Sequence, residues 1–123
     1  MEKVAEVLRG VFYIATVEGD QPRVRAFDSC TDYNGKIYFE TTNTKNVYRQ
    51  LKDNPKFELF AMGEQGILRL AGEAIEEEDA AVANAVEEKI GKYLGDPSLV
   101  VFRMERVLAT ITDQSGEKET ISF

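Results

Sequence analysis

The sequence predicts an α+β protein in which antiparallel strands form a small closed or partly closed barrel with a few inserted helices. Short apolar runs recur along the chain and several alternate with polar residues. Turn signals such as Asn34-Gly35 separate neighbouring runs, and helical spacing of apolar residues appears in only a few places. With 123 residues and a hydrophobic fraction of 43%, the chain is expected to be one domain, residues 1–123.

The first predicted helix covers residues 2–9, where Val4, Val7 and Leu8 recur at helical spacing before Gly10. Three strands are then expected to pair through short turns, because turn-forming residues separate their apolar runs. The predicted strands are 11–17, which is apolar on both faces, 23–30 and 36–41, with turns at 18–22 and at Asn34-Gly35.

The stretch 37–51 predicts a strand that passes through hydroxyl and amide side chains into a helix, expected over residues 44–52. Lys45 adds a cation where backbone N–H groups have no helical partner. The residues that can cap the first turn are Thr42, Asn43 and Thr44. These features favour a phosphate or carboxylate site at the junction. The same residue types also fit an ordinary capped helix that binds only water.

Asn54-Pro55 ends this helix, and the second half of the chain again predicts strands with one inserted helix. Gly72 indicates a bulge or a tight bend within a strand. Acidic residues 76–79 precede a helix that is expected to run to about Leu94. The predicted strands are 56–62, 67–75, 99–104, 107–112 and a short last one that ends at Phe123.

Charge and composition exclude several classes of protein. A net charge of −7 argues against a nucleic-acid partner, since phosphate backbones require clustered basic charge. No apolar run approaches the roughly 20 residues that cross a bilayer, so no membrane partner is expected. The start of the chain has no apolar signal segment, and a cytoplasmic location is therefore expected.

The chain contains no histidine, no tryptophan and a single cysteine, Cys30. An internal disulfide, a Cys/His zinc site, a Ser-His-Asp triad and a Cys-His nucleophile pair are therefore excluded, and no metal site is expected. Cys30 is predicted to be a small buried hydrophobic residue, with a redox role as the alternative. Any enzymatic chemistry is expected to come from a bound cofactor.

Six short segments, spread over nearly the whole chain, occur in the order and at the spacing that one known protein family shows. They are FYIATV at 12–17, QPRVRAF at 21–27, GKIYFET at 35–41, NTKNVYRQL at 43–51, NP at 54–55 and LAGEA at 70–74. This pattern resembles the pyridoxamine 5′-phosphate oxidase-like family of FMN-binding proteins. The resemblance implies an antiparallel split β-barrel of six to eight strands with about three helices. It also implies a homodimer that holds FMN at its interface.

The resemblance assigns cofactor-binding positions residue by residue. Arg25 matches the family arginine that reaches the FMN phosphate, and Lys45 matches the phosphate-binding lysine at the helix start. The residues expected to supply further phosphate donors are Asn43, Thr44 and Asn46. Those whose main chain is expected to run beside the flavin ring are Ala26, Phe27, Glu40 and Thr41. Two cations suit a dianionic phosphate, which supports the assignment.

The sequence departs from the vitamin-converting oxidases of this family. Those enzymes have a lysine after the arginine strand, at a place that falls near Cys30 in this chain, and late tryptophan and histidine residues that are missing here. The chain therefore resembles a small member of the family and not the vitamin-converting oxidase itself. Nitroimidazole-resistance-type proteins are similar in size, although that subgroup often has a histidine near the flavin.

The predicted function is that of an FMN-binding oxidoreductase that passes electrons from a reduced nicotinamide to a small acceptor through FMN. No catalytic residue is identified. The alternative is a non-catalytic flavin-binding electron carrier or redox sensor. A third possibility is a barrel that has lost flavin or binds haem or a deazaflavin, although the lack of histidine disfavours haem.

Overall fold

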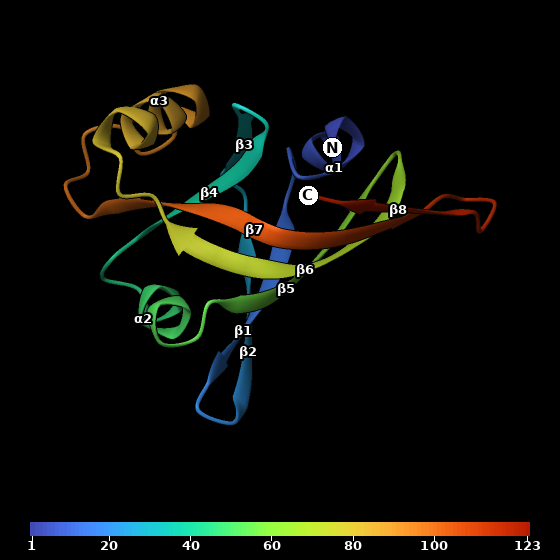
Figure 1. Ribbon diagram of the computed structural model, residues 1–123, viewed down its shortest axis with the longest axis horizontal. Coiled ribbons are helices and arrows are strands. Elements are labelled where there is room, and N and C mark those ends of the chain that lie inside the picture. Colours follow the sequence, from blue (N-terminus) through green and yellow to red (C-terminus); the bar gives the residue numbers. More distant parts are fainter.

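The computed structural model describes residues 1–123 as one antiparallel sheet of eight strands with three helices (Figure 1). The helices are α1 (Glu2–Val7), α2 (Asn46–Asp53) and α3 (Ala80–Ile90). The strands are β1 (Phe12–Glu18), β2 (Gln21–Phe27), β3 (Cys30–Tyr33), β4 (Lys36–Thr42), β5 (Lys56–Gly63), β6 (Gly66–Glu76), β7 (Leu99–Thr112) and β8 (Lys118–Ser122). None of the helices is long and apolar enough to cross a membrane.

The sheet does not close into a barrel. Its strand order is β2-β1-β5-β6-β7-β4-β3, with β8 paired to β7, so that β2 and β3 lie at opposite ends. This arrangement is an α+β fold consistent with a split barrel, as the sequence predicts. Figure 1 shows the curved sheet with α2 and α3 at one end, on opposite sides of β6 and β7, and α1 near the other end.

The chain passes from one end of the sheet to the other between β2 and β3. Asp28 and Ser29 make this link, so the single strand predicted over residues 23–30 is wrong. Phe27 shows why the chain divides here: its ring stacks on Phe12 at 5.9 Å and meets Phe39 edge-on at 5.4 Å. These aromatic contacts hold the end of β2 near β4, although the two strands do not pair.

Strands β6 and β7 form the longest pairing and share an irregularity. The register shifts between Ala71 and Glu73, which confirms the bulge predicted at Gly72. Arg106, near this shift on β7, has a φ of 49°. Residues 99–112 nevertheless form one strand, so the two separate strands predicted there are wrong. The adjacent charged residues Glu105 and Arg106 lie at a bulge within the strand and do not end it.

The core lies inside the curve of the sheet. Twenty buried residues form one cluster, to which α1 contributes Val4 and Val7, its C-cap contributes Leu8, and α2 contributes Val47 and Leu51. A smaller cluster beneath α3 contains Tyr38, Val86 and Val101. Helix α2 is thus fixed to the inner core, whereas α3 covers the outer face of β4 and β7.

The observed start of α2 and the observed end of α3 differ from the predicted ones. Helix α3 stops at Gly91, which has a φ of 72°, and so does not reach Leu94. Helix α2 begins after Lys45, and no side chain caps it, so the predicted cap by Thr42, Asn43 or Thr44 is wrong. The hydroxyls of Thr42 and Thr44 instead lie 2.9 Å apart. The first turn of α2 is left without a side-chain acceptor for its N–H groups.

Candidate functional site

A cavity of about 360 Å³ lies in the opening between β2 and β4. Residues 25–27 of β2 form one wall, and residues 40–42 of β4 form the other. Lys45 and Val47 at the start of α2 border it, as do Tyr93 and Asp96 of the segment between α3 and β7. The cavity exists because β2 and β4 lie near opposite ends of the strand order and do not pair.

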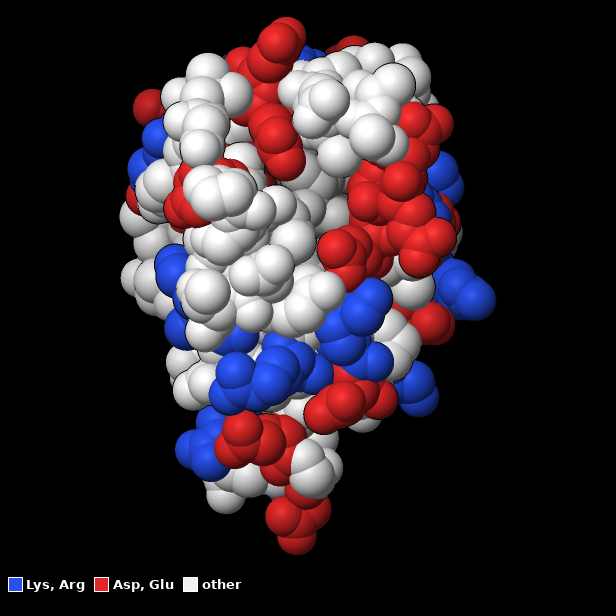
Figure 2. Space-filling view, turned by 90° about the vertical axis from the view of Figure 1, so that its left-hand side faces the viewer, with Lys and Arg blue, Asp and Glu red and all other residues white.

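A second cavity of about 430 Å³ adjoins the first and shares Arg25, Lys45 and Val47 with it. It continues past Arg23 and Asn46 along the first turn of α2. We call the two cavities together the split groove. Figure 2 shows a band of Lys and Arg side chains across the face that carries α2, with acidic groups above and below it. The second cavity is lined by three cations, Arg23, Arg25 and Lys45, and one carboxylate, Glu18, so this end of the split groove is basic in an otherwise acidic protein.

Arg25 is half-buried at the point where the two cavities meet. Its guanidinium donates to the Ile14 carbonyl oxygen at 3.1 Å, to Thr16 Oγ1 at 2.8 Å and to Gln50 Oε1. These acceptors are all uncharged, and no carboxylate pairs with Arg25. Burial alone lowers the pKa of Arg25 from its ordinary value. Arg25 therefore presents a positioned positive charge that lacks a counterion.

Two buried polar side chains hold Arg25 in place. Thr16 is 2% exposed and Gln50 is 5% exposed, and Thr16 Oγ1 donates to Gln50 Oε1 at 2.6 Å. Gln50 Nε2 in turn approaches Glu18 Oε2 at 3.4 Å. Neither Thr16 nor Gln50 is predicted as a site residue from the sequence. A signal was present for Gln50, because it lies at helical spacing with Val47 and Leu51 on the buried face of α2.

Lys45 immediately precedes α2 and forms no ion pair. Its exposed ammonium borders both cavities, so the two predicted cations share one end of the split groove. Asn46 lines the adjoining cavity, where its Oδ1 accepts from Arg49. Asn43 and Thr44 line neither cavity.

The remaining predicted residues line the first cavity from two strands. Ala26 and Phe27 are on β2, and Glu40 and Thr41 are on β4. Pairing of β4 with β3 ends at Phe39, after which the Glu40 N–H donates to the Ser29 carbonyl oxygen at 3.2 Å. Beyond that point β4 pairs only with β7, so its other edge is free to bond a ligand that enters the split groove.

Glu40 and Thr41 are 2% and 4% exposed, and their side-chain oxygens have no hydrogen-bond partner. Buried polar groups rarely remain unpaired, which is typical of a place where a ligand or water completes the bonding. Burial and, to a smaller extent, the Glu87 carboxylate raise the pKa of Glu40 to about 7, against the opposing effect of Lys92.

The arrangement suits one kind of ligand. Two cations without counterions can bind a phosphate or another dianion at the basic end. The open edge of β4 offers main-chain hydrogen bonds to a planar polar ring in the first cavity. No group of three or more His, Cys, Asp or Glu side chains is arranged to hold a metal ion. Burial also raises the pKa of the Cys30 thiol, which keeps it protonated.

The fold and the split groove define a split-barrel protein with a site suited to an anionic ligand that has a planar part. The chain belongs to the pyridoxamine 5′-phosphate oxidase family, whose model matches residues 1–111. The family predicted from the sequence is thereby confirmed. No curated protein matches the sequence significantly.

Solved structures extend this result. A NimC/NimA family protein from Clostridium acetobutylicum is 36% identical, with a TM-score of 0.90 over 100% of this chain and 92% of that chain. General Stress Protein 26 from Bacillus anthracis is 18% identical, with a TM-score of 0.68 over 98% and 97% of the two chains. A pyridoxamine 5′-phosphate oxidase-related, FMN-binding protein from Nostoc punctiforme is 12% identical, with a TM-score of 0.62 over 98% and 90%. The last two show similarity of fold alone.

Proposed function

We propose that the protein is a flavoprotein that binds FMN in the split groove. The observation that carries this proposal is the half-buried Arg25, which is held by uncharged acceptors and shares one end of the groove with Lys45. The family match and the FMN-binding neighbour from Nostoc punctiforme support the choice of ligand. A phosphate at this end would supply the counterion that neither cation finds within the chain.

The residues that are present fit this cofactor. Arg25 and Lys45 would hold the phosphate, and Asn46 is placed to add a donor. The main chain of Ala26–Phe27 and the free edge of β4 would flank the ring, where Glu40 and Thr41 have unpaired oxygens. Asn43 and Thr44 stay predictions, since they lie outside the groove as described. When bound, FMN would supply hydride and single-electron chemistry, while the protein binds and orients it.

The proposed activity is that of an oxidoreductase. Two electrons would pass from a reduced nicotinamide to a small acceptor, with the flavin as the redox group. This assignment is compatible with the chain's lack of histidine, because the redox chemistry would reside in the cofactor.

We also propose that the protein is a homodimer with FMN at its interface. Directly paired residues of antiparallel strands point to the same side of a sheet, so the register identifies one outer face. The large apolar residues that are exposed on this face are Tyr13, Val24, Met62, Ile67 and Leu108. Several exposed apolar side chains on neighbouring strands, interspersed here with Glu58 and Arg69, are typical of a protein–protein contact.

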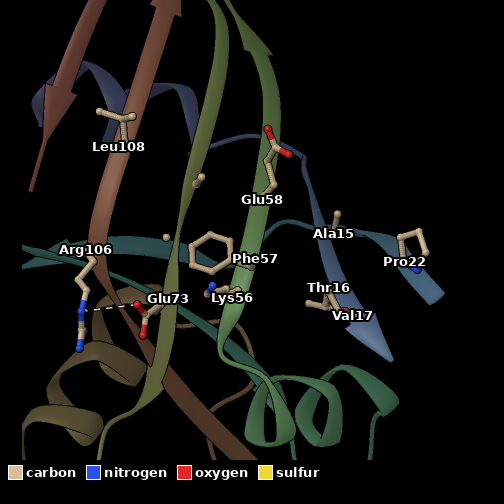
Figure 3. A pocket seen from close by; sticks show the side chains of 12 residues that line it. Ala15, Thr16, Val17, Pro22, Lys56, Phe57, Glu58, Glu73, Arg106 and Leu108 are labelled. Carbon is tan, nitrogen blue, oxygen red and sulfur yellow. Dashed lines mark ion pairs between the residues drawn. The ribbon is translucent and has the colours of Figure 1, made fainter. Parts of the chain in front are cut away.

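A depression of about 500 Å³ in this region supports a second copy as the partner (Figure 3). Phe57 lies at its centre, and charged side chains of both signs border it, with Arg106 Nε and Glu73 Oε2 3.5 Å apart. Lys56 and Glu58 add a further charge of each sign. A two-fold interface places the same patch on both subunits, so a patch with both signs of charge can pair with itself.

Titration of the ligand-free protein with FMN tests the proposed cofactor. We expect saturable quenching of flavin fluorescence and a bound flavin spectrum, and the absence of both would contradict the proposal. Turnover of NADH or NADPH with an artificial acceptor tests the activity. Steady turnover supports the oxidoreductase, whereas tight flavin binding without turnover indicates the electron carrier or redox sensor.

A further inference from the structure

Glu40 differs from the other acidic residues of the chain because its carboxyl group is both buried and unpaired. It is 2% exposed, and neither Oε1 nor Oε2 has a hydrogen-bond partner. A carboxylate buried without a partner is strongly disfavoured, and such a group neutralises itself by holding a proton. Nothing in the proposed binding of FMN uses this carboxyl group, so its burial requires a separate explanation.

The position of Glu40 places its carboxyl beside the split groove. Glu40 pairs with Val101 on β7, and both lie on the face of the sheet that α3 covers. Thr41 points to the opposite, inner face, because side chains alternate along a strand. The two unpaired side chains therefore flank the free edge of β4, and both residues line the first cavity.

The surroundings of Glu40 contain charges of both signs. Helix α3 contributes Glu87, and the segment after it contributes Lys92, which also pairs with Asp28 of the link between β2 and β3. On β7 the nearest charged residue of the same face, Arg103, is already bonded to Glu77 and Glu105. The other ionisable groups that line the cavity are Arg25, Lys45, Tyr93 and Asp96. No cation pairs with Glu40 directly.

We propose that Glu40 takes up a proton from solvent when the split groove binds its anionic ligand, so that this one carboxyl couples FMN binding to pH. The inference rests on the proposed function. A phosphate brings negative charge into the groove, and a ring displaces water from the cavity. Both changes disfavour the ionised carboxylate and therefore favour its protonation. The proton comes from solvent and ends on a Glu40 oxygen.

The same two changes determine the direction in which FMN affinity depends on pH. Burial and Glu87 already bring the pKa of Glu40 to about 7 without a ligand. If the ligand raises it further, then the affinity contributed by this group is complete below pH 7 and declines as the pH rises through that value. Titration of the phosphate itself acts at lower pH, near 6, and is common to every variant of the protein.

Calorimetry of FMN binding to the wild-type protein and to Glu40→Gln tests the proposal. At pH 7.5, titrations in two buffers of different ionisation enthalpy report the number of protons taken up. We expect greater uptake by the wild type than by Glu40→Gln. We also expect the dissociation constant of the wild type, divided by that of Glu40→Gln, to increase several-fold between pH 7 and pH 8.5. Equal proton uptake by the two proteins would overturn the inference while leaving FMN binding intact.

A measurement on the ligand-free protein separates this inference from the proposed function. Carbon-13 NMR of the glutamate carboxyls should show one group, absent from Glu40→Gln, that titrates near neutral pH. Glu87→Gln should lower that midpoint, because it removes a negative charge near Glu40. If Glu40→Gln does not fold, Glu87→Gln still gives this result. A midpoint that Glu87→Gln leaves unchanged overturns the inference alone, whereas failure of the wild type to bind FMN overturns the proposed function and the inference that rests on it.

Discussion

At the scale of single residues, the split groove depends on which partners Arg25 lacks. Its guanidinium is bonded to a carbonyl, a hydroxyl and an amide oxygen, which fix its direction without cancelling its charge. Gln50 is central, since its Oε1 accepts from both Arg25 and Thr16. An uncharged acceptor at this position leaves Arg25 free to bind an anion.

Replacement of Gln50 by glutamate should therefore weaken FMN binding. The new carboxylate would pair with Arg25 and compete with the phosphate, so we expect a dissociation constant about tenfold higher. Fluorescence titration measures this change. Gln114→Glu, in the turn before β8, adds the same charge far from the groove and should bind FMN like the wild type. Similar affinities for both variants would show that Arg25 does not contact the phosphate.

Replacement of Glu40 by glutamine should change how stability depends on pH. The pKa of Glu40 rises from 4.5 to about 7 on folding, so between these values the native protein holds a proton that the unfolded chain releases. The wild type should lose at most about 3 kcal/mol of stability across this range. Glu40→Gln lacks this loss, and its relative stability in urea should increase from pH 5 to pH 8. A constant difference would contradict the elevated pKa.

At the scale of elements, the hairpin of β5 and β6 is packed most tightly at its turn. Gly66 has a φ of 124°, and a Cβ there would lie 2.1 Å from the Thr112 carbonyl oxygen of β7. Neither backbone can move without breaking the pairing of β6 with β7. This one glycine thus sets the approach of the hairpin to the end of β7.

Gly66→Ala should destabilise the protein by more than about 3 kcal/mol, since it combines a backbone clash with an unfavourable φ. Urea unfolding measures this loss. Gly10→Ala is the matched control, because nothing lies within 4 Å of its added Cβ, and its effect should stay within about 0.5 kcal/mol. A similar small effect at both positions would contradict the packing described for Gly66.

Local pattern predicted most of these elements. Alternation of Phe57, Leu59 and Ala61 identified β5, and the helical spacing of Val47 and Leu51 identified α2. The sequence pattern gave wrong predictions where contacts between distant segments determine the secondary structure. The run from Arg23 to Cys30 is continuous in sequence, but its two halves pair with different strands, and only the fold shows this division.

The site was predictable to a similar extent. The resemblance located Arg25 and Lys45, and the structure brings both to one groove. The buried partners of Arg25 come from β1 and α2, segments that no local pattern connects with β2. The burial of Glu40 also could not be predicted, because α3 and the segment that follows it cover this residue, and both are distant in sequence.

At the scale of the whole molecule, the outer face of the sheet carries several large apolar side chains that are exposed. Val24, on strand β2, is 70% exposed there, and Leu108 on β7 is 54% exposed. Strand β2 also forms a wall of the split groove through Arg25–Phe27. A second copy on this face would therefore lie beside the groove, which connects the proposed dimer with the proposed site.

Val24→Lys should weaken the dimer, because it buries an unpaired charge in an apolar interface. Light scattering of the wild type should give twice the chain mass of 13.8 kDa, and the variant should shift toward the single-chain mass. Leu94→Lys, at a residue 59% exposed on the segment after α3, makes the same change away from this face and should remain dimeric. A wild type that is monomeric with FMN bound would contradict the dimer.

We propose that Arg25 and Lys45 hold the phosphate of FMN at the basic end of the split groove. Titration of the wild type and Lys45→Ala with FMN and with riboflavin, which lacks the phosphate, tests this most directly. Lys45→Ala should weaken FMN binding by about 1–3 kcal/mol and leave riboflavin binding unchanged. Equal effects on both ligands, or no effect on either, would contradict the claim.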